Sequence, residues 1–264
     1  MSLKQRATTS LFFVIAVLSL VLINDISLCF LLLSIAALVA YEYSKIIAPN
    51  SFYKIIIAFT ICGMLTALLF LKQGSPYIII ACVLTSITLM LNLFSKKDFI
   101  DHKTFFIPLF NFYIIIPCII AVFYITSGVL DYKLFLGMLI LIWVSDAGAY
   151  LVGSRIGKTK LFERISPGKT WEGFFGGGML AMISAYIISS FMNLWDFQQW
   201  IIIGLICWIL GTIGDLIESK VKRTYKIKDS GTILPGHGGF YDRFDSFIFV
   251  LPFILIYFEY FIQA

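Results

Sequence analysis

Four aspartates stand out in the polar stretch between residues 214 and 245 of an otherwise apolar chain: Asp215, Asp229, Asp242 and Asp245. A carboxylate near hydrocarbon costs about 2.5–3.5 kcal/mol on insertion scales, so several in one region imply a cation that holds them. Asp242 and Asp245 are three residues apart, which places them on one face of a helix. With Asp215 they form a set of hard oxygen ligands suited to Mg²⁺, which completes its coordination with water and substrate phosphates. The alternative is salt bridging to basic neighbours, namely Lys220, Arg223 and Arg243.

A basic block separates these carboxylates along the chain and consists of Lys220, Lys222, Arg223, Lys226 and Lys228. Cationic donors beside a metal site are what phosphoryl transfer requires, because the charge of the transition state is spread over the metal and the donors. For any single lysine, an ordinary positively charged loop on the cytoplasmic side of a membrane is the alternative. The block as a whole predicts a site that binds phosphates.

The sequence Pro235-Gly236-His237-Gly238-Gly239 follows the basic block and has little side-chain bulk. Backbone N–H groups in such a loop can approach phosphate oxygens. His237 could donate a hydrogen bond to a phosphate or transfer a proton, although a lone histidine is more often structural. The loop adds to the predicted phosphate site.

A second polar segment runs from Asp146 to Gly173. Asp146 lies inside an apolar span and must therefore face a partner, a metal or a polar cavity. The sequence Gly168-Lys169-Thr170 suggests a P-loop, but that motif requires a glycine where Glu163 stands, so it is excluded. Lys169 remains a candidate phosphate contact. We expect a helix to start at Ser166-Pro167, with Lys169 in its first turns, and the glycines 176–178 to serve helix packing.

The elements that must position these residues are membrane helices. The 264 residues are 60% hydrophobic and only 13% charged, too few charges to cover a soluble protein of this size. Apolar runs long enough to cross a bilayer recur along the chain, and the pattern of a membrane barrel is absent. We therefore predict an all-α, polytopic helix bundle with about nine spans, over residues 10–23, 26–43, 52–71, 77–94, 105–126, 134–153, 174–194, 201–217 and 244–261.

The distribution of charge predicts how the chain is oriented in the membrane and which part of it carries the catalytic residues. With the N-terminus in the cytoplasm, all of the 20 Lys and Arg residues except Lys72 and Lys133 fall on the cytoplasmic side. Residues 1–133 carry few charges within spans, Glu42 being the main exception, and are predicted to be a transmembrane scaffold. Residues 134–264 are predicted to be the catalytic region. The five cysteines, isolated in apolar segments without metal or disulfide spacing, are predicted to act as small hydrophobic residues.

Several motifs resemble the phosphatidate cytidylyltransferases, also called CDP-diglyceride synthetases. The main one begins Ser219-Lys220-Val221-Lys222-Arg223, continues with Lys228-Asp229, and ends with Leu234 to Asp245, LPGHGGFYDRFD. Further similar motifs are Asp146-x-x-Ala149-Tyr150-x-x-Gly153, Ser166-Pro167-x-Lys169-Thr170-x-Glu172-Gly173, and the opening Leu3-Lys4-Gln5-Arg6. Gly168 departs from the pattern, since many members have a lysine there.

This resemblance implies a Mg²⁺-dependent reaction of CTP with phosphatidic acid that yields CDP-diacylglycerol and pyrophosphate. It implies Asp215, Asp242 and Asp245 as the metal-centred carboxylates, with a second cation such as K⁺. The predicted catalytic residues are these three together with His237 and Lys228. The predicted substrate-binding residues are Asp146, Lys169, Ser219, Lys220, Lys222, Arg223, Gly238, Gly239 and Arg243.

The expected partners are CTP, phosphatidic acid and membrane lipids, without nucleic acid. The expected location is the cell (inner) membrane, with the site facing the cytoplasm, and the resemblance suggests a homodimer. Two alternatives stay open. One is a related CTP-using membrane enzyme that acts on another lipid, such as a polyprenol kinase or a synthase for ether lipids. The other is a transporter, which the clustering of charges in one half and at one face argues against.

Overall fold

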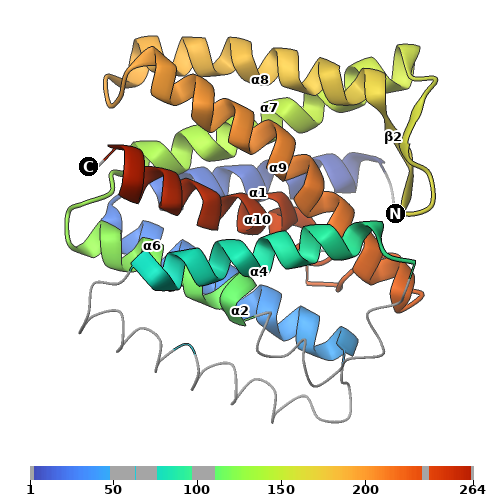
Figure 1. Ribbon diagram of the computed structural model, residues 1–264, viewed down its shortest axis with the longest axis horizontal. Coiled ribbons are helices and arrows are strands. Elements are labelled where there is room, and N and C mark those ends of the chain that lie inside the picture. Colours follow the sequence, from blue (N-terminus) through green and yellow to red (C-terminus); the bar gives the residue numbers. More distant parts are fainter. Residues whose placement is uncertain (1–2, 48–62, 64–75, 97–110, 234–237, 263–264) are drawn as a thin grey trace. The chain divides into compact units, whose positions relative to one another are not determined.

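The computed structural model describes residues 3–47, 63, 76–96, 111–233 and 238–262, and these residues are nearly all helical (Figure 1). The chain forms two compact units. The first contains Met1–Tyr132, Val221–Phe244 and Leu251–Ala264. The second contains Lys133–Lys220 and Asp245–Val250. Helices α9 (Phe197–Thr224) and α10 (Tyr241–Tyr257) contribute residues to both units.

The elements of the first unit before α10 are α1 (Leu3–Leu22), α2 (Asp25–Ile47), α4 (Pro76–Phe94), the π-helical turn η2 (Asn111–Ile115) and α6 (Ile116–Thr126). Helix α2 packs against α1, η2 and α6, and α4 packs against η2 and α6. Asn24 makes the tight turn from α1 to α2, because its side chain accepts a hydrogen bond from the backbone N–H of Ser27 (2.8 Å). At the other end of the chain, the carboxylate of Glu259 in η3 (Phe258–Ile262) accepts a hydrogen bond from the Tyr124 hydroxyl (2.6 Å).

The second unit is built on closely packed helices with glycine at their contacts. Its elements before α9 are α7 (Tyr132–Ile156), the strands β1 (Lys160–Phe162) and β2 (Ser166–Thr170), and α8 (Trp171–Met192). Helices α7 and α8 approach so closely that a Cβ on Gly177 would lie 2.6 Å from the carbonyl oxygen of Ser145. A Cβ on Gly178 would lie 2.3 Å from Trp208 of α9. The predicted packing role of this glycine run is confirmed.

Strands β1 and β2 form an antiparallel hairpin that corrects one prediction. Ser166 and Pro167 lie in β2, and α8 begins only at Trp171, so the helix start predicted at Ser166-Pro167 is wrong. Proline disfavours helical geometry in the residue before it and is tolerated in an edge strand. The N-cap of α8 is Thr170, whose side-chain oxygen accepts a hydrogen bond from the Gly173 N–H (3.2 Å).

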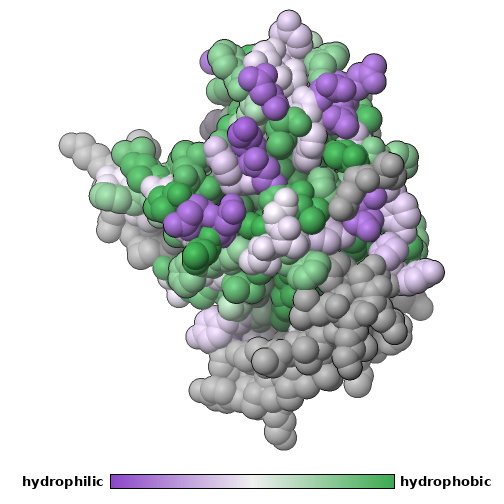
Figure 2. Space-filling model, turned by 90° about the vertical axis from the view of Figure 1, so that its left-hand side faces the viewer, coloured by the Kyte–Doolittle hydropathy of each residue, from purple (hydrophilic) through white to green (hydrophobic). Residues whose placement is uncertain are grey.

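Six described helices are long and apolar enough to cross a membrane: Asp25–Ile46, Pro76–Phe94, Tyr132–Ile156, Trp171–Met192, Phe197–Thr224 and Tyr241–Ile262. In the view of Figure 2, hydrophobic residues lie at the surface beside hydrophilic ones, and many large hydrophobic side chains are exposed, among them Phe12, Phe30 and Phe191. Thr8–Leu22 and Phe112–Thr126 form shorter apolar helices. The span predicted over residues 52–71 lies outside the described residues except for Gly63, so the count of nine spans stays a prediction. The predicted orientation in the membrane also stays a prediction.

The described cysteines agree with the role expected of them. Cys29, Cys82, Cys118 and Cys207 are buried and unoxidised, while Cys62 lies outside the described residues. Burial among apolar neighbours is the usual environment of a free structural cysteine.

Candidate functional site

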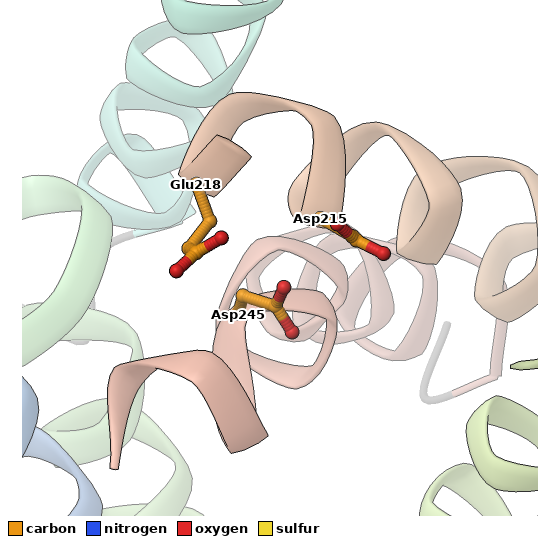
Figure 3. Close-up of side chains that lie close together, drawn as sticks. All are labelled: Asp215, Glu218 and Asp245. Atoms are coloured by element: carbon orange, nitrogen blue, oxygen red, sulfur yellow. The ribbon is translucent and has the colours of Figure 1, made fainter. Parts of the chain in front are cut away.

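Three carboxylates come together in the second unit. Asp215 and Glu218 project from α9 and Asp245 projects from α10, as Figure 3 shows. One oxygen of each lies within 4.8 Å of those of the other two. Glu218 is 1% exposed and Asp245 is 9% exposed. Three carboxylate oxygens at this spacing are a hard donor set of the kind that Mg²⁺ or Ca²⁺ prefers.

Small residues on α9 bring the backbone of α10 close enough to form this group. A Cβ on Gly214 would lie 2.7 Å from the Cβ of Phe249 and 2.9 Å from the carbonyl oxygen of Asp245. The Ser246 hydroxyl donates a hydrogen bond to the carbonyl oxygen of Gly211 (3.0 Å). The Ser246 N–H donates to Oδ1 of Asp245 (2.6 Å) and helps to orient that carboxylate.

Lys169 supplies a cation at the edge of the acidic group. Its ammonium nitrogen lies 2.5 Å from Oδ2 of Asp215, and the Ser219 hydroxyl donates to Oδ1 of the same carboxylate (3.3 Å). Burial lowers the pKa of Lys169, but the negative charge and hydrogen bond of Asp215, together with Asp146 and Asp245, outweigh burial and raise that pKa above its usual value. Lys169 is therefore a fixed positive charge at neutral pH.

Asp242 belongs to a different set of contacts, in the first unit. Its Oδ1 accepts from the ammonium of Lys222 (2.8 Å). Its Oδ2 accepts from the backbone N–H of Ser230 (2.9 Å), the Ser230 hydroxyl (3.0 Å) and the backbone N–H of Gly239 (2.7 Å). Metal ligation by Asp242 stays a prediction, since both of its oxygens are engaged by protein donors here.

Glu42 joins the same set of contacts and was not among the predicted site residues. Its carboxylate accepts from the Ser230 hydroxyl (3.0 Å) and from the backbone N–H groups of Phe240 and Tyr241 (2.9 Å each). The side chain comes from α2 and is 2% exposed. The signal in the sequence was a carboxylate at the end of an apolar span, which is costly unless it has partners.

The predicted set is thus distributed over both units. Asp215 and Asp245 come together as predicted, while Glu218 was missed although it lies one helical turn after Asp215 on the same face. Lys220 is buried in the second unit. Four predicted residues are exposed: Asp146, Arg223, Lys228 and Arg243.

The glycine loop is described only in part. His237 lies outside the described residues. Gly238 has a φ of +84°, a conformation that suits glycine, and the Gly239 N–H donates to Asp242. Contact of this loop with phosphate stays a prediction.

These features define a helical membrane protein with a carboxylate group beside a lysine. The chain belongs to the cytidylyltransferase family, whose model matches residues 4–261. It is 50% identical over 116 residues to the phosphatidate cytidylyltransferase of Bacillus subtilis, covering 44% of this chain and 43% of that protein.

Two further relatives carry the same name. The phosphatidate cytidylyltransferase of Staphylococcus aureus (strain COL) is 49% identical over 119 residues, covering 44% of this chain and 45% of that protein. That of Staphylococcus epidermidis is 40% identical over 151 residues, covering 53% and 57%. The chain therefore spans about half the length of the curated relatives it matches.

Proposed function

We propose that this protein is a phosphatidate cytidylyltransferase. A phosphate oxygen of phosphatidic acid attacks the α-phosphorus of CTP, the bond from that phosphorus to the oxygen bridging to the β-phosphorus breaks, and pyrophosphate leaves with the bond's electron pair. The product is CDP-diacylglycerol. The observation that carries the proposal is the acidic group beside Lys169, in a chain of the cytidylyltransferase family whose relatives bear this name.

The chemistry places modest demands on the protein. The phosphate monoester is already an anion, so no strong base is needed to make it a nucleophile. Catalysis can rest on positioning two anionic substrates in line and on neutralising their charge. A membrane-embedded protein suits the lipid substrate, because its acyl chains can stay in the bilayer while the headgroup reaches a polar site.

The acidic group fits a divalent metal. Asp215, Glu218 and Asp245 offer three carboxylate oxygens to a hard cation, and we propose that they hold Mg²⁺. When bound, Mg²⁺ neutralises the carboxylates and the triphosphate of the nucleotide. Asp242 as a further ligand, and a second cation such as K⁺, remain part of the proposal.

The basic residues are proposed to bind the substrate phosphates. Lys169 pairs with Asp215 and would meet a phosphate oxygen that approaches the acidic group. We assign phosphate contacts also to Ser219, Lys220, Lys222, Arg223, Lys228, His237, Gly238, Gly239 and Arg243. The excess of basic residues in the predicted cytoplasmic segments supports a site on the cytoplasmic face of the cell (inner) membrane. A homodimer is also expected.

The test uses purified protein in detergent with CTP labelled in the cytidine and with phosphatidic acid, with and without Mg²⁺. We expect magnesium-dependent transfer of label into the lipid extract and release of pyrophosphate. Substituting CTP labelled at the γ-phosphate should leave the lipid unlabelled. Transfer of γ-phosphate to a polyprenol, with no cytidine in lipid, would instead identify a lipid kinase and overturn the proposal.

A further inference from the structure

Glu42 lies far in sequence from every other residue discussed for the site, yet its carboxylate is the acceptor for the start of α10. The N–H groups of Phe240 and Tyr241, 198 and 199 residues further on, both donate to it at 2.9 Å. The first N–H groups of a helix have no partner within the helix. Phe240, at the N-cap position of α10, provides no side-chain acceptor. Glu42 therefore caps α10 from α2, where a negative charge is also favoured by the helix dipole.

The Ser230 hydroxyl connects this cap to Asp242. Its oxygen lies 3.0 Å from Oε2 of Glu42 and 3.0 Å from Oδ2 of Asp242. A hydroxyl has one proton, so Ser230 donates to one of these two carboxylates at a time. Because Asp242 also holds Lys222 and the Gly239 N–H, the cap and the ion pair form one connected network.

The glycines of this region leave room for the Glu42 carboxylate. A Cβ on Gly231 would lie 2.3 Å from Oε1 of Glu42, and one on Gly239 would lie 2.4 Å from Oε2. Any other residue at either position would displace a carboxylate that is 2% exposed. The backbone at Gly231 and the backbone at Gly239 thus both lie close against the Glu42 carboxylate. These close approaches are a second observation, separate from the hydrogen bonds that Glu42 accepts.

We propose that Glu42 is a positioning residue for cytidylyl transfer. It does not touch substrate. It fixes the backbone at Ser230, Gly231 and Gly239–Tyr241, and through Ser230 it fixes Asp242 and Lys222, which the proposed reaction uses. The inference rests on the proposed function.

The test compares Glu42→Gln with Glu259→Gln. Both glutamates belong to the first unit and accept a hydrogen bond from a side-chain hydroxyl, but the donor to Glu259 is Tyr124, whereas the donor to Glu42 is Ser230. A glutamine at position 42 has one acceptor oxygen, and its amide would present a donor to a backbone N–H. We expect kcat/KM for CTP to fall about tenfold or more, the effect of losing one hydrogen bond to a charged group. Glu259→Gln should stay within about twofold of wild type.

Deuterium exchange separates positioning from general destabilisation. In folded Glu42→Gln, exchange should rise at the amides of Ser230, Gly239, Phe240 and Tyr241 and stay unchanged in α7 and α8. Should Glu42→Gln not accumulate in folded form, Ser230→Ala removes the hydroxyl between Glu42 and Asp242 while leaving both carboxylates in place. It should lower kcat/KM for CTP and raise exchange at Ser230 and Gly239, whose N–H groups donate to Asp242, while Phe240 and Tyr241 keep their acceptor on Glu42. Wild-type kinetics and exchange in the folded variant would overturn the inference. An inactive wild-type protein would instead refute the proposed function, while the exchange measurement would still decide whether Glu42 holds this segment.

Discussion

Gly214 and Gly211 lie one turn apart on α9, and substituting each by alanine tests how the acidic group is held together. A Cβ on Gly214 would come within 2.7 Å of the Phe249 Cβ, 2.9 Å of the Asp245 carbonyl oxygen and 3.1 Å of the Ser246 Cα. Two of these three atoms are backbone and cannot rotate away. A Cβ on Gly211 would meet Ser246 at 3.7 Å, an ordinary contact. The two variants thus carry the same substitution in the same helix, but the added methyl group clashes with α10 only at position 214.

The magnitudes follow from overpacking and from helix propensity. Forcing an extra methyl into a filled contact costs about 1–3 kcal/mol. Replacing a glycine inside a helix by alanine stabilises it by up to about 1 kcal/mol. Gly211→Ala should therefore be neutral or stabilising. Gly214→Ala should be less stable than Gly211→Ala by roughly 1–3 kcal/mol. If α10 shifts to relieve the clash with the added methyl group, Asp245 should move away from Asp215 and Glu218.

The assay measures thermal unfolding in detergent and the Mg²⁺ concentration needed for half-maximal cytidylyl transfer. Gly214→Ala should unfold at a lower temperature than Gly211→Ala and require several-fold more Mg²⁺, because its carboxylates are spread apart. Gly211→Ala should match wild type in Mg²⁺ requirement. Equal stability and equal Mg²⁺ requirement in the two variants would refute the reasoning that close approach at Gly214 assembles the acidic group.

Three further outcomes are expected. Asp245→Asn should lose nearly all transfer activity while remaining folded and inserted, because the acidic group loses a charge; activity that persists at wild-type Mg²⁺ concentrations would contradict this. Lys169→Met should lower kcat/KM for CTP at least about tenfold. The control Lys160→Met, at an exposed position of the same hairpin, should leave kcat/KM unchanged. Equal effects of the two substitutions would show that only the general charge of the hairpin matters. Asp242→Asn, which loses the ion pair with Lys222, should be folded but inactive, and near-normal turnover would remove Asp242 from the proposed metal site.

Features that depend on local composition could be read from the sequence. Apolar length located the six described spans, because a helix in a bilayer needs a run of about 20 apolar residues wherever it packs. The cost of charge in apolar surroundings drew attention to Asp215 and Asp245, whose carboxylates come together in the structure. The glycine run 176–178 was recognised as a packing surface because small residues allow helices to approach.

The tertiary structure alone decided which polar groups meet. The approach of α10 to α9 at Gly214 brings Asp245 to Asp215 and Glu218, which α9 places one turn apart. The hairpin over residues 160–170 replaces a predicted helix start and brings Lys169 to Asp215. Glu42 caps a helix that begins 199 residues later. Hydrogen bonds and ion pairs act over about 3 Å, and sequence separation carries no information about them; only the folded chain brings such partners within reach.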